Sequence, residues 1–355
     1  MRGYLNLEDG TTLEGIMVGA SRQSEGEVVF TTGMTGYPES LTDPSFAGQI
    51  LVFTYPLIGN YGVPAPKTTA AHIMENFESE RIWARGVVVS DAIETPSHYT
   101  MSQTFGAWCA SGSIPLLSGI DTRALTQKLR EHGTMRGNIS FRKKKVTTAT
   151  HDENLVSLVS IAEPIVYAAR ELGAKHVVLL DCGVKHGILR ALLSAGFQVT
   201  RLPHDYDPLR IKGIDGVVCS NGPGDPKDCK KTIDNIKHVI SSGIPFLGIC
   251  LGHQLLALAV GADTYKLRYG HRGLNQPCLE LQSKKAYVTS QNHGHAVDRR
   301  TIPKGFTEWF VNLNDGTNEG LCAPNKRVWS TQFHPEGNPG PSETDWVFGM
   351  FRSAL

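Results

Sequence analysis

Short runs of alternating apolar and polar residues, separated by turn-forming residues, mark the first third of the chain. Tyr4–Glu8 and Thr11–Val18 flank Asp9-Gly10, a dipeptide that favours a two-residue hairpin turn. The run Gly26–Phe30 continues this strand-like pattern. We therefore predict a β-rich domain over residues 1–141.

One segment of this domain has clear helical periodicity. It spans Asp121–His132, with Asp121 or Thr122 suited to cap its start and Gly133 suited to end it. The prediction for the N-terminal domain is therefore a sheet with one helix.

The pattern changes twice after residue 141. Residues 142–174 lack strong periodicity, and we predict that they form a linker. From residue 175 onwards, short apolar strands alternate with helices, beginning with the strand His176–Asp181 and the helix Gly187–Ala195. This alternation predicts a second, α/β domain over residues 175–355, with a doubly wound and mainly parallel sheet.

Ligands of such sheets bind beyond the carboxyl ends of the strands, so the residues that follow strands are the candidates for chemistry. Gly248-Ile249-Cys250-Leu251-Gly252 joins one predicted strand to the next helix. The glycines allow a sharp turn that projects Cys250, and the positive end of the helix dipole favours the thiolate form. We predict that Cys250 is a nucleophile. The alternative is a buried apolar cysteine, which we favour for the other six.

A histidine and a glutamate follow the strand-like run Arg327–Gln332, in the sequence Phe333-His334-Pro335-Glu336. Pro335 favours an extended His334, and side chains two apart in an extended chain point the same way. His334 is therefore predicted to transfer protons while Glu336 fixes its tautomer. With Cys250, these residues complete a Cys-His-Glu set.

Composition narrows the range of functions. The chain has 355 residues, 35 Lys and Arg against 34 Asp and Glu, and a net charge of +1, so we expect no nucleic-acid partner. No run approaches a membrane span and the start lacks a secretory signal, so we expect a cytoplasmic protein without a membrane partner. The seven cysteines include no C-x-x-C pair, and we expect no metal site.

The motifs around Cys250 and His334 jointly resemble those of class I, triad-type glutamine amidotransferases. Further segments, over nearly the whole chain outside the linker, are similar to the glutaminase component of carbamoyl phosphate synthetase. The N-terminal segments decide this subfamily, because other amidotransferases share the glutaminase domain but not the β-rich domain. The segments are Thr35–Glu39, Leu41–Ser45, Ser220–Pro226 and Ser290–Gly294. Two more, Tyr55–Gly62 and Asn275–Cys278, look closest to the fused, pyrimidine-pathway form.

The resemblance implies that Cys250 attacks the glutamine side-chain amide to form a thioester, releasing ammonia, and that water then hydrolyses the thioester. Ammonia would pass to a large synthetase component, where ATP, expected there with Mg²⁺, and bicarbonate yield carbamoyl phosphate for pyrimidine or arginine synthesis. We expect no cofactor on this chain. Glutamine binding is implied for Ser45, Gly222, Gly224, Leu251, Gln254, Asn292, Gly294 and His295.

His295 departs from the family pattern, in which the residue after Gly294 is often aromatic. Three alternatives stay open beside the main hypothesis. The chain could feed ammonia to another acceptor, act as a free-standing glutamine hydrolase, or serve as an inactive docking module. The N-terminal domain argues against the first two, and the intact Cys250, His334 and Glu336 argue against the third.

Overall fold

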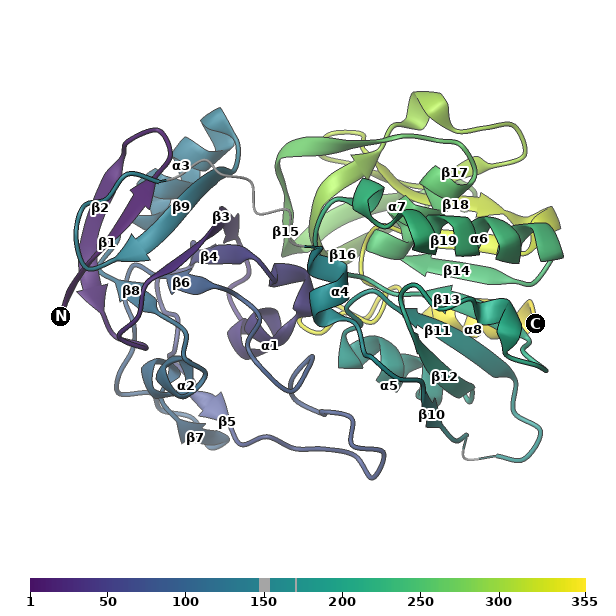
Figure 1. Ribbon diagram of the computed structural model, residues 1–355, viewed down its shortest axis with the longest axis horizontal. Helices are drawn as coiled ribbons and strands as arrows, with labels where there is room; N and C mark the ends of the chain where they lie inside the picture. Colours follow the sequence, from purple (N-terminus) through teal and green to yellow (C-terminus); the bar gives the residue numbers. More distant parts are fainter. Residues whose placement is uncertain (147–153, 170) are drawn as a thin grey trace. The chain divides into compact units, whose positions relative to one another are not determined.

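The computed structural model describes residues 1–146, 154–169 and 171–355 (Figure 1). It divides into two compact units, unit 1 over Met1–Glu153 and unit 2 over Asn154–Leu355. Helix α4 (Leu155–Val159) and strand β10 (Ile165–Tyr167) lie in unit 2, within the segment predicted as a linker. Part of that segment, 147–153 and 170, lies outside the described residues.

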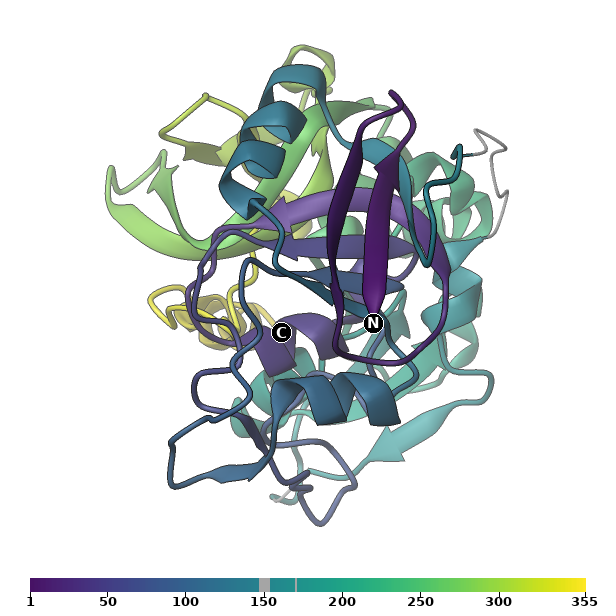
Figure 2. The same ribbon diagram turned by 90° about the vertical axis from the view of Figure 1, so that its left-hand side faces the viewer.

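Unit 1 is built on a closed barrel with the strand order β1-β2-β8-β6-β4-β3-β9. Figure 2 shows the hairpin of β1 and β2 in purple. Its register pairs Leu5 with Leu13 and Asn6 with Thr12, so the strands meet around the predicted Asp9-Gly10 turn. The barrel strands are β1 (Arg2–Leu7), β2 (Thr12–Met17), β3 (Ser24–Thr31), β4 (Gln49–Phe53), β6 (Gly86–Val88), β8 (Leu116–Ser118) and β9 (Met135–Ser140).

The predicted helix of this unit is confirmed as α3 (Thr122–His132). The Asp121 carboxylate accepts a hydrogen bond from the Ala124 amide, and Gly133 ends the helix with a positive φ of 99°. The sequence pattern missed α1 (Tyr37–Thr42) and α2 (Phe105–Ser111), which are too short to show a helical period. A small sheet of β5 (Val63–Pro64) and β7 (Met101–Gln103) completes unit 1.

In the described part of the chain, unit 2 holds a ten-stranded sheet with the order β10-β12-β11-β13-β14-β19-β18-β17-β15-β16. The strands from β12 to β19 in this order are parallel, as predicted. Those strands are β12 (Gln198–Pro203), β11 (His176–Asp181), β13 (Gly216–Cys219), β14 (Phe246–Ile249) and β19 (Val328–Thr331).

The other half of this sheet is antiparallel, which the prediction of a mainly parallel sheet missed. β15 pairs with β16 and β17 pairs with β18, while the link from β16 to β17 passes over β15, because β17 pairs with β15. Within residues 264–323, all of which the structure describes, no α-helix separates these strands, so this part of the chain lacks the alternation of strands and helices that is typical of a parallel sheet. The strands are β15 (Thr264–Glu280), β16 (Ala286–Val297), β17 (Thr307–Asn312) and β18 (Asn318–Ala323).

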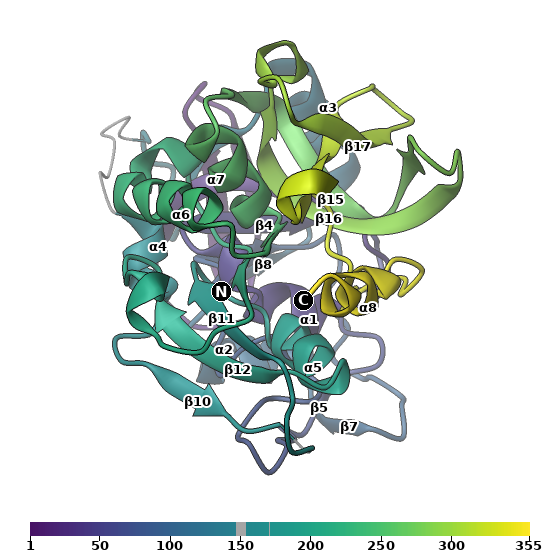
Figure 3. The same ribbon diagram turned by 90° about the vertical axis from the view of Figure 1, so that its right-hand side faces the viewer.

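Helices cover both faces of the parallel strands (Figure 3). On β11, Val178 and Leu180 join the apolar cluster that includes Ile236 and Leu255, while the alternate residues Val177 and Leu179 are equally buried. Among the described residues, no helix is long and apolar enough to cross a membrane. The remaining helices are α5 (His186–Ser194), α6 (Lys230–Ser242), α7 (Leu251–Ala259) and α8 (Trp346–Ser353).

Candidate active site

Cys250 lies at the turn between β14 and α7. Its backbone has φ 53° and ψ −102°, a conformation that residues other than glycine rarely adopt. Both flanking positions require glycine, because the backbone approaches them closely. A Cβ added to Gly248 would lie 2.5 Å from the backbone oxygen of Gly252, and a Cβ added to Gly252 would lie 2.2 Å from the backbone oxygen of Cys219. This strained turn holds the thiol at the carboxyl end of the sheet, as expected of a nucleophile elbow.

His334 and Glu336 form a buried pair just after β19. The Glu336 Oε1 atom lies 2.7 Å from His334 Nδ1, and each side chain is only 1% exposed. The His334 amide donates to the Ser290 oxygen at 2.9 Å, which anchors the histidine beside β16. The buried Nε2 atom of His334 has no hydrogen-bond partner in the described part of the chain. That nitrogen is therefore available for proton transfer.

Lys185 is a third buried charge at this site, and the sequence analysis did not select it. Its Nζ atom donates to Glu336 Oε1 at 2.9 Å and to the Gly337 oxygen at 2.7 Å, and its side chain is 2% exposed. Lys185 directly precedes α5, four residues beyond the end of β11. A charged residue after a strand end was the only available signal for it.

The charges of these groups explain their protonation. Burial alone would lower the pKa of His334, but the Glu336 carboxylate outweighs this effect and raises it to about 10, with a further contribution from Cys250. Burial would raise the pKa of Glu336, but Lys185 and His334 lower it to about 2. His334 therefore holds a proton beside Cys250, which it can give up and take back during a reaction at the thiol.

Strand β16 carries predicted glutamine-binding residues and contacts both Cys250 and Gln254. The Cys250 thiol donates to the Asn292 oxygen at 3.6 Å, and Gln254 Nε2 donates to the His295 oxygen at 2.9 Å. The ring of His295 lies 3.6 Å from an oxygen of Asp225, in the loop after β13. Asn292, Gln254 and His295 are therefore held around the nucleophile, and Gly294 lies between two of them.

The loop after β13 supplies the other predicted residues of unit 2. Gly222 lies against the Leu251 side chain, next to the nucleophile, and Gly224 follows two residues later with a φ of 91°. Ser45 lies in unit 1, on the short 3₁₀ helix Pro44–Phe46, where Asp43 accepts a hydrogen bond from its amide. The glutamine contacts of all these residues stay predictions.

Replacing Lys185 by methionine is expected to move the acidic limb of the glutaminase pH–rate profile to higher pH. Lys185 keeps the pKa of Glu336 low, so without Lys185 the Glu336 carboxylate is protonated at a higher pH. The neutral carboxyl no longer stabilises the charged form of His334. We expect turnover to fall roughly 10- to 100-fold, less than a loss of the base itself would cause. Initial rates between pH 4 and 9 measure both effects.

Lys175→Met is the matched control, because it removes another lysine–carboxylate pair of unit 2. Lys175 Nζ lies 3.0 Å from Asp215 Oδ1, but that pair is partly exposed, and its two residues directly precede β11 and β13 instead of following a strand end. Its removal should leave the profile unchanged. An unshifted acidic limb in a folded Lys185→Met protein would contradict the role given to Lys185.

Family models and curated relatives match nearly the whole chain. The family model "Carbamoyl-phosphate synthase small chain, CPSase domain" matches residues 5–139, and "Glutamine amidotransferase class-I" matches residues 178–354. The chain is 48% identical over 356 residues to the carbamoyl phosphate synthase arginine-specific small chain of Neurospora crassa, covering 97% of this chain and 78% of that protein. The chain belongs to the carbamoyl phosphate synthase small-chain family.

A second relative is the carbamoyl phosphate synthase arginine-specific small chain of Aspergillus oryzae. The two sequences are 45% identical, and the match covers 100% of this chain and 80% of that protein. A solved glutamine amidotransferase from Thermotoga maritima matches 47% of this chain and 77% of its own, with 21% identity and a TM-score of 0.38. The two family models and the relative from Neurospora crassa confirm the family resemblance, and the chain is the glutaminase component of this kind of synthase. The sheet topology confirms an α/β fold with a β-rich N-terminal domain. Both relatives are named as arginine-specific, whereas the sequence motifs suggested the fused pyrimidine-pathway form.

Proposed function

We propose that this chain hydrolyses L-glutamine through a thioester on Cys250 and delivers the ammonia to the large component of a carbamoyl phosphate synthase. The observation that carries the proposal is the buried His334–Glu336 pair beside a cysteine held at a strained elbow. This set provides a nucleophile, a proton-transfer group and an orienting carboxylate. The names of the relatives favour an arginine-specific enzyme.

The first step forms the thioester. The Cys250 sulfur attacks the carbonyl carbon of the glutamine side-chain amide, and His334 Nε2 carries the thiol proton to the leaving nitrogen, which departs as ammonia. The backbone N–H of Leu251, the first residue of α7, has no acceptor within its helix and is placed to stabilise the oxyanion. Asn292, Gln254 and the backbone around Gly294 would hold the amino-acid end of glutamine.

The second step regenerates the enzyme. Water attacks the thioester carbonyl, His334 takes a proton from that water, and the sulfur leaves to release glutamate. Glu336 remains ionised and hydrogen-bonded to Nδ1 through both steps, and Lys185 holds Glu336 in place. We assign ATP, Mg²⁺ and bicarbonate to the large component, because the loop Asn221–Pro226 lacks the Lys-Ser/Thr ending of a phosphate-binding P-loop.

Assembly with a carbamoyl phosphate synthase large component tests this purpose. We expect the two chains to co-elute on sizing and the complex to form carbamoyl phosphate from glutamine, ATP and bicarbonate. We also expect glutamine hydrolysis by the chain alone to be slow and to accelerate on assembly. An assembled complex that used ammonium salt but never glutamine, or the absence of any complex, would refute the proposal.

A further inference from the structure

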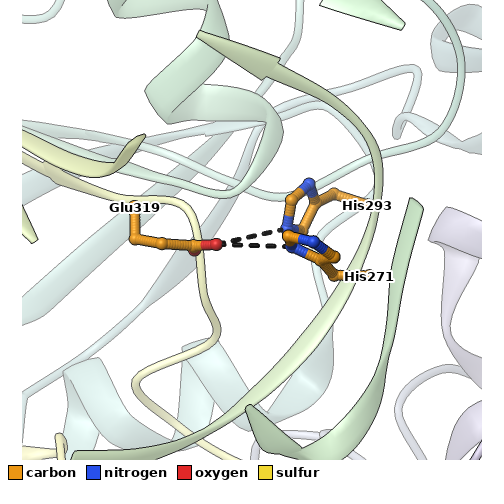
Figure 4. A group of neighbouring side chains, drawn as sticks. All are labelled: His271, His293 and Glu319. Carbon is orange, nitrogen blue, oxygen red and sulfur yellow. Dashed lines mark ion pairs between the residues drawn. The ribbon is translucent and has the colours of Figure 1, made fainter. Parts of the chain in front are cut away.

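Two histidines and a glutamate meet away from the Cys-His-Glu set, on three antiparallel strands of unit 2. Figure 4 shows His271 of β15, His293 of β16 and Glu319 of β18 with their side chains directed toward one another. One ligand atom from each residue can be chosen such that all lie within 4.8 Å of one another. All three residues are buried, Glu319 completely. No step proposed for glutamine hydrolysis uses them.

The distances from Glu319 to the two rings are compatible with a small cation bound between the side chains. Glu319 Oε1 lies 3.4 Å from His271 Nδ1 and 3.9 Å from His293 Nε2. Ligands of a tetrahedral Zn²⁺ ion, with metal bonds of about 2.0–2.1 Å, are separated by roughly 3.3 Å. Among the described residues, neither His271 Nδ1 nor Glu319 Oε2 has a hydrogen-bond partner, although both atoms are buried. Buried polar atoms without partners are costly, and a shared cation would satisfy both.

The surroundings fix the outer nitrogens of both rings in the way that metal-binding histidines require. His271 Nε2 lies 2.9 Å from Asp315 Oδ2, and His293 Nδ1 lies 2.8 Å from the His295 oxygen. Each acceptor directs one N–H outward and leaves the opposite nitrogen to face Glu319. The Asn312 amide donates to Glu319 Oε1 at 3.2 Å and orients that carboxylate. Metal-binding histidines commonly have such carboxylate or carbonyl partners.

The neighbouring charged and amide side chains affect how strongly a cation would bind and which atoms would coordinate it. Asp315 and Glu319 face the site with negative charge, and Arg272, whose charge acts on His293, opposes them. Gln291 Oε1 lies 3.1 Å from His293 Nε2, so this amide either turns away from the ring or adds an oxygen ligand. The simplest alternative occupant is a proton on His271, which would pair with both carboxylates.

We propose that His271, His293 and Glu319 bind one divalent transition-metal ion, with Zn²⁺ as the preferred chemistry. Two imidazoles and one carboxylate are a ligand set that Zn²⁺ uses, with water or Gln291 in the fourth position. The ion joins β15, β16 and β18, and β16 also carries Asn292 and His295. This proposal departs from the sequence-based expectation that the chain has no metal site. Its role is to hold the strand that borders the nucleophile.

Direct metal binding tests the proposal. The full chain carrying Cys250→Ser, so that the reactive thiol cannot bind metal, is stripped with a chelator, dialysed and titrated with Zn²⁺ by calorimetry. We expect one ion per chain, and His271→Asn or Glu319→Gln in the same background should weaken binding at least about 100-fold. Asp315→Asn, which alters an outer partner of His271 and leaves the three proposed ligands in place, should weaken it about 10- to 100-fold. Zinc should raise the melting temperature of the parent protein and less so that of these variants.

His238→Asn is the matched control, because His238 is an exposed histidine on α6, and it should bind zinc like the parent. Co²⁺ substitution should give a spectrum without sulfur-to-metal charge transfer. The proposal is overturned by fewer than one ion per chain, by cobalt bound through sulfur, or by unchanged affinity in the variants. Should the Glu319 or His271 variants fail to fold by circular dichroism, Asp315→Asn decides, because that side chain is 42% exposed.

Discussion

Carbamoyl phosphate synthesis from glutamine is expected to fall at least about 10⁴-fold when Cys250 is replaced by alanine, because no other group can form the thioester. Synthesis from added ammonium salt should be unchanged, since ammonia bypasses the reaction at Cys250. The assay compares the two nitrogen sources in complexes of the large component with wild-type or Cys250→Ala chain.

Cys109→Ala is the matched control for loss of a thiol. Cys109 is completely buried in unit 1, where burial raises the pKa of its thiol, and it lacks flanking elbow glycines. This variant should use both nitrogen sources like the wild type. Glutamine-dependent synthesis that survived in Cys250→Ala, or ammonium-dependent synthesis that disappeared with it, would contradict the thioester mechanism.

Replacing His334 by asparagine should lower glutamine turnover by roughly 10²- to 10⁴-fold, the usual contribution of a general acid–base group. Asparagine keeps a polar side chain but cannot exchange the proton between Cys250, the leaving nitrogen and water. The KM for glutamine should change much less than kcat, because His334 is not assigned to substrate binding. Steady-state kinetics on the assembled complex separate the two constants.

His176→Asn offers a comparison for His334→Asn. His176 opens β11, at the end of that strand opposite the proposed site, and its ring contacts Thr200 Oγ1 at 2.8 Å. Its replacement should leave kcat unchanged. A His334→Asn enzyme with normal kcat and only a raised KM would show that the histidine binds substrate and does not transfer protons.

Local sequence signals predicted the elements whose start, period and end are all marked by residues within the same short segment. The helix Thr122–His132 has an aspartate cap, a helical period and a terminating glycine, all within a short stretch of chain. The elbow at Cys250 was recognisable because its two glycines flank the cysteine within five residues, although the contact that requires Gly252 comes from Cys219 of β13. Short helices such as Tyr37–Thr42 carry too few residues to show a period, so they were missed.

Pairing between distant residues was predictable only in part. His334 and Glu336 are two residues apart, so their contact follows from an extended backbone. Lys185 contacts the same carboxylate although it lies 151 positions away in the sequence, because the segments that follow β11 and β19 leave the same edge of the sheet. No spacing rule links residues so far apart, and the contact became visible only when the sheet order was known.

The sequence by itself therefore determined the alternation of strands and helices in unit 2, the strand-end positions of Cys250 and His334, and the family to which the chain belongs. The tertiary structure alone decided the antiparallel half of the sheet, the charge that Lys185 adds to the active site, and the meeting of His271, His293 and Glu319. The physical reason is that strand order and register bring these side chains together. Neither order nor register is encoded by the residues next to any one of them.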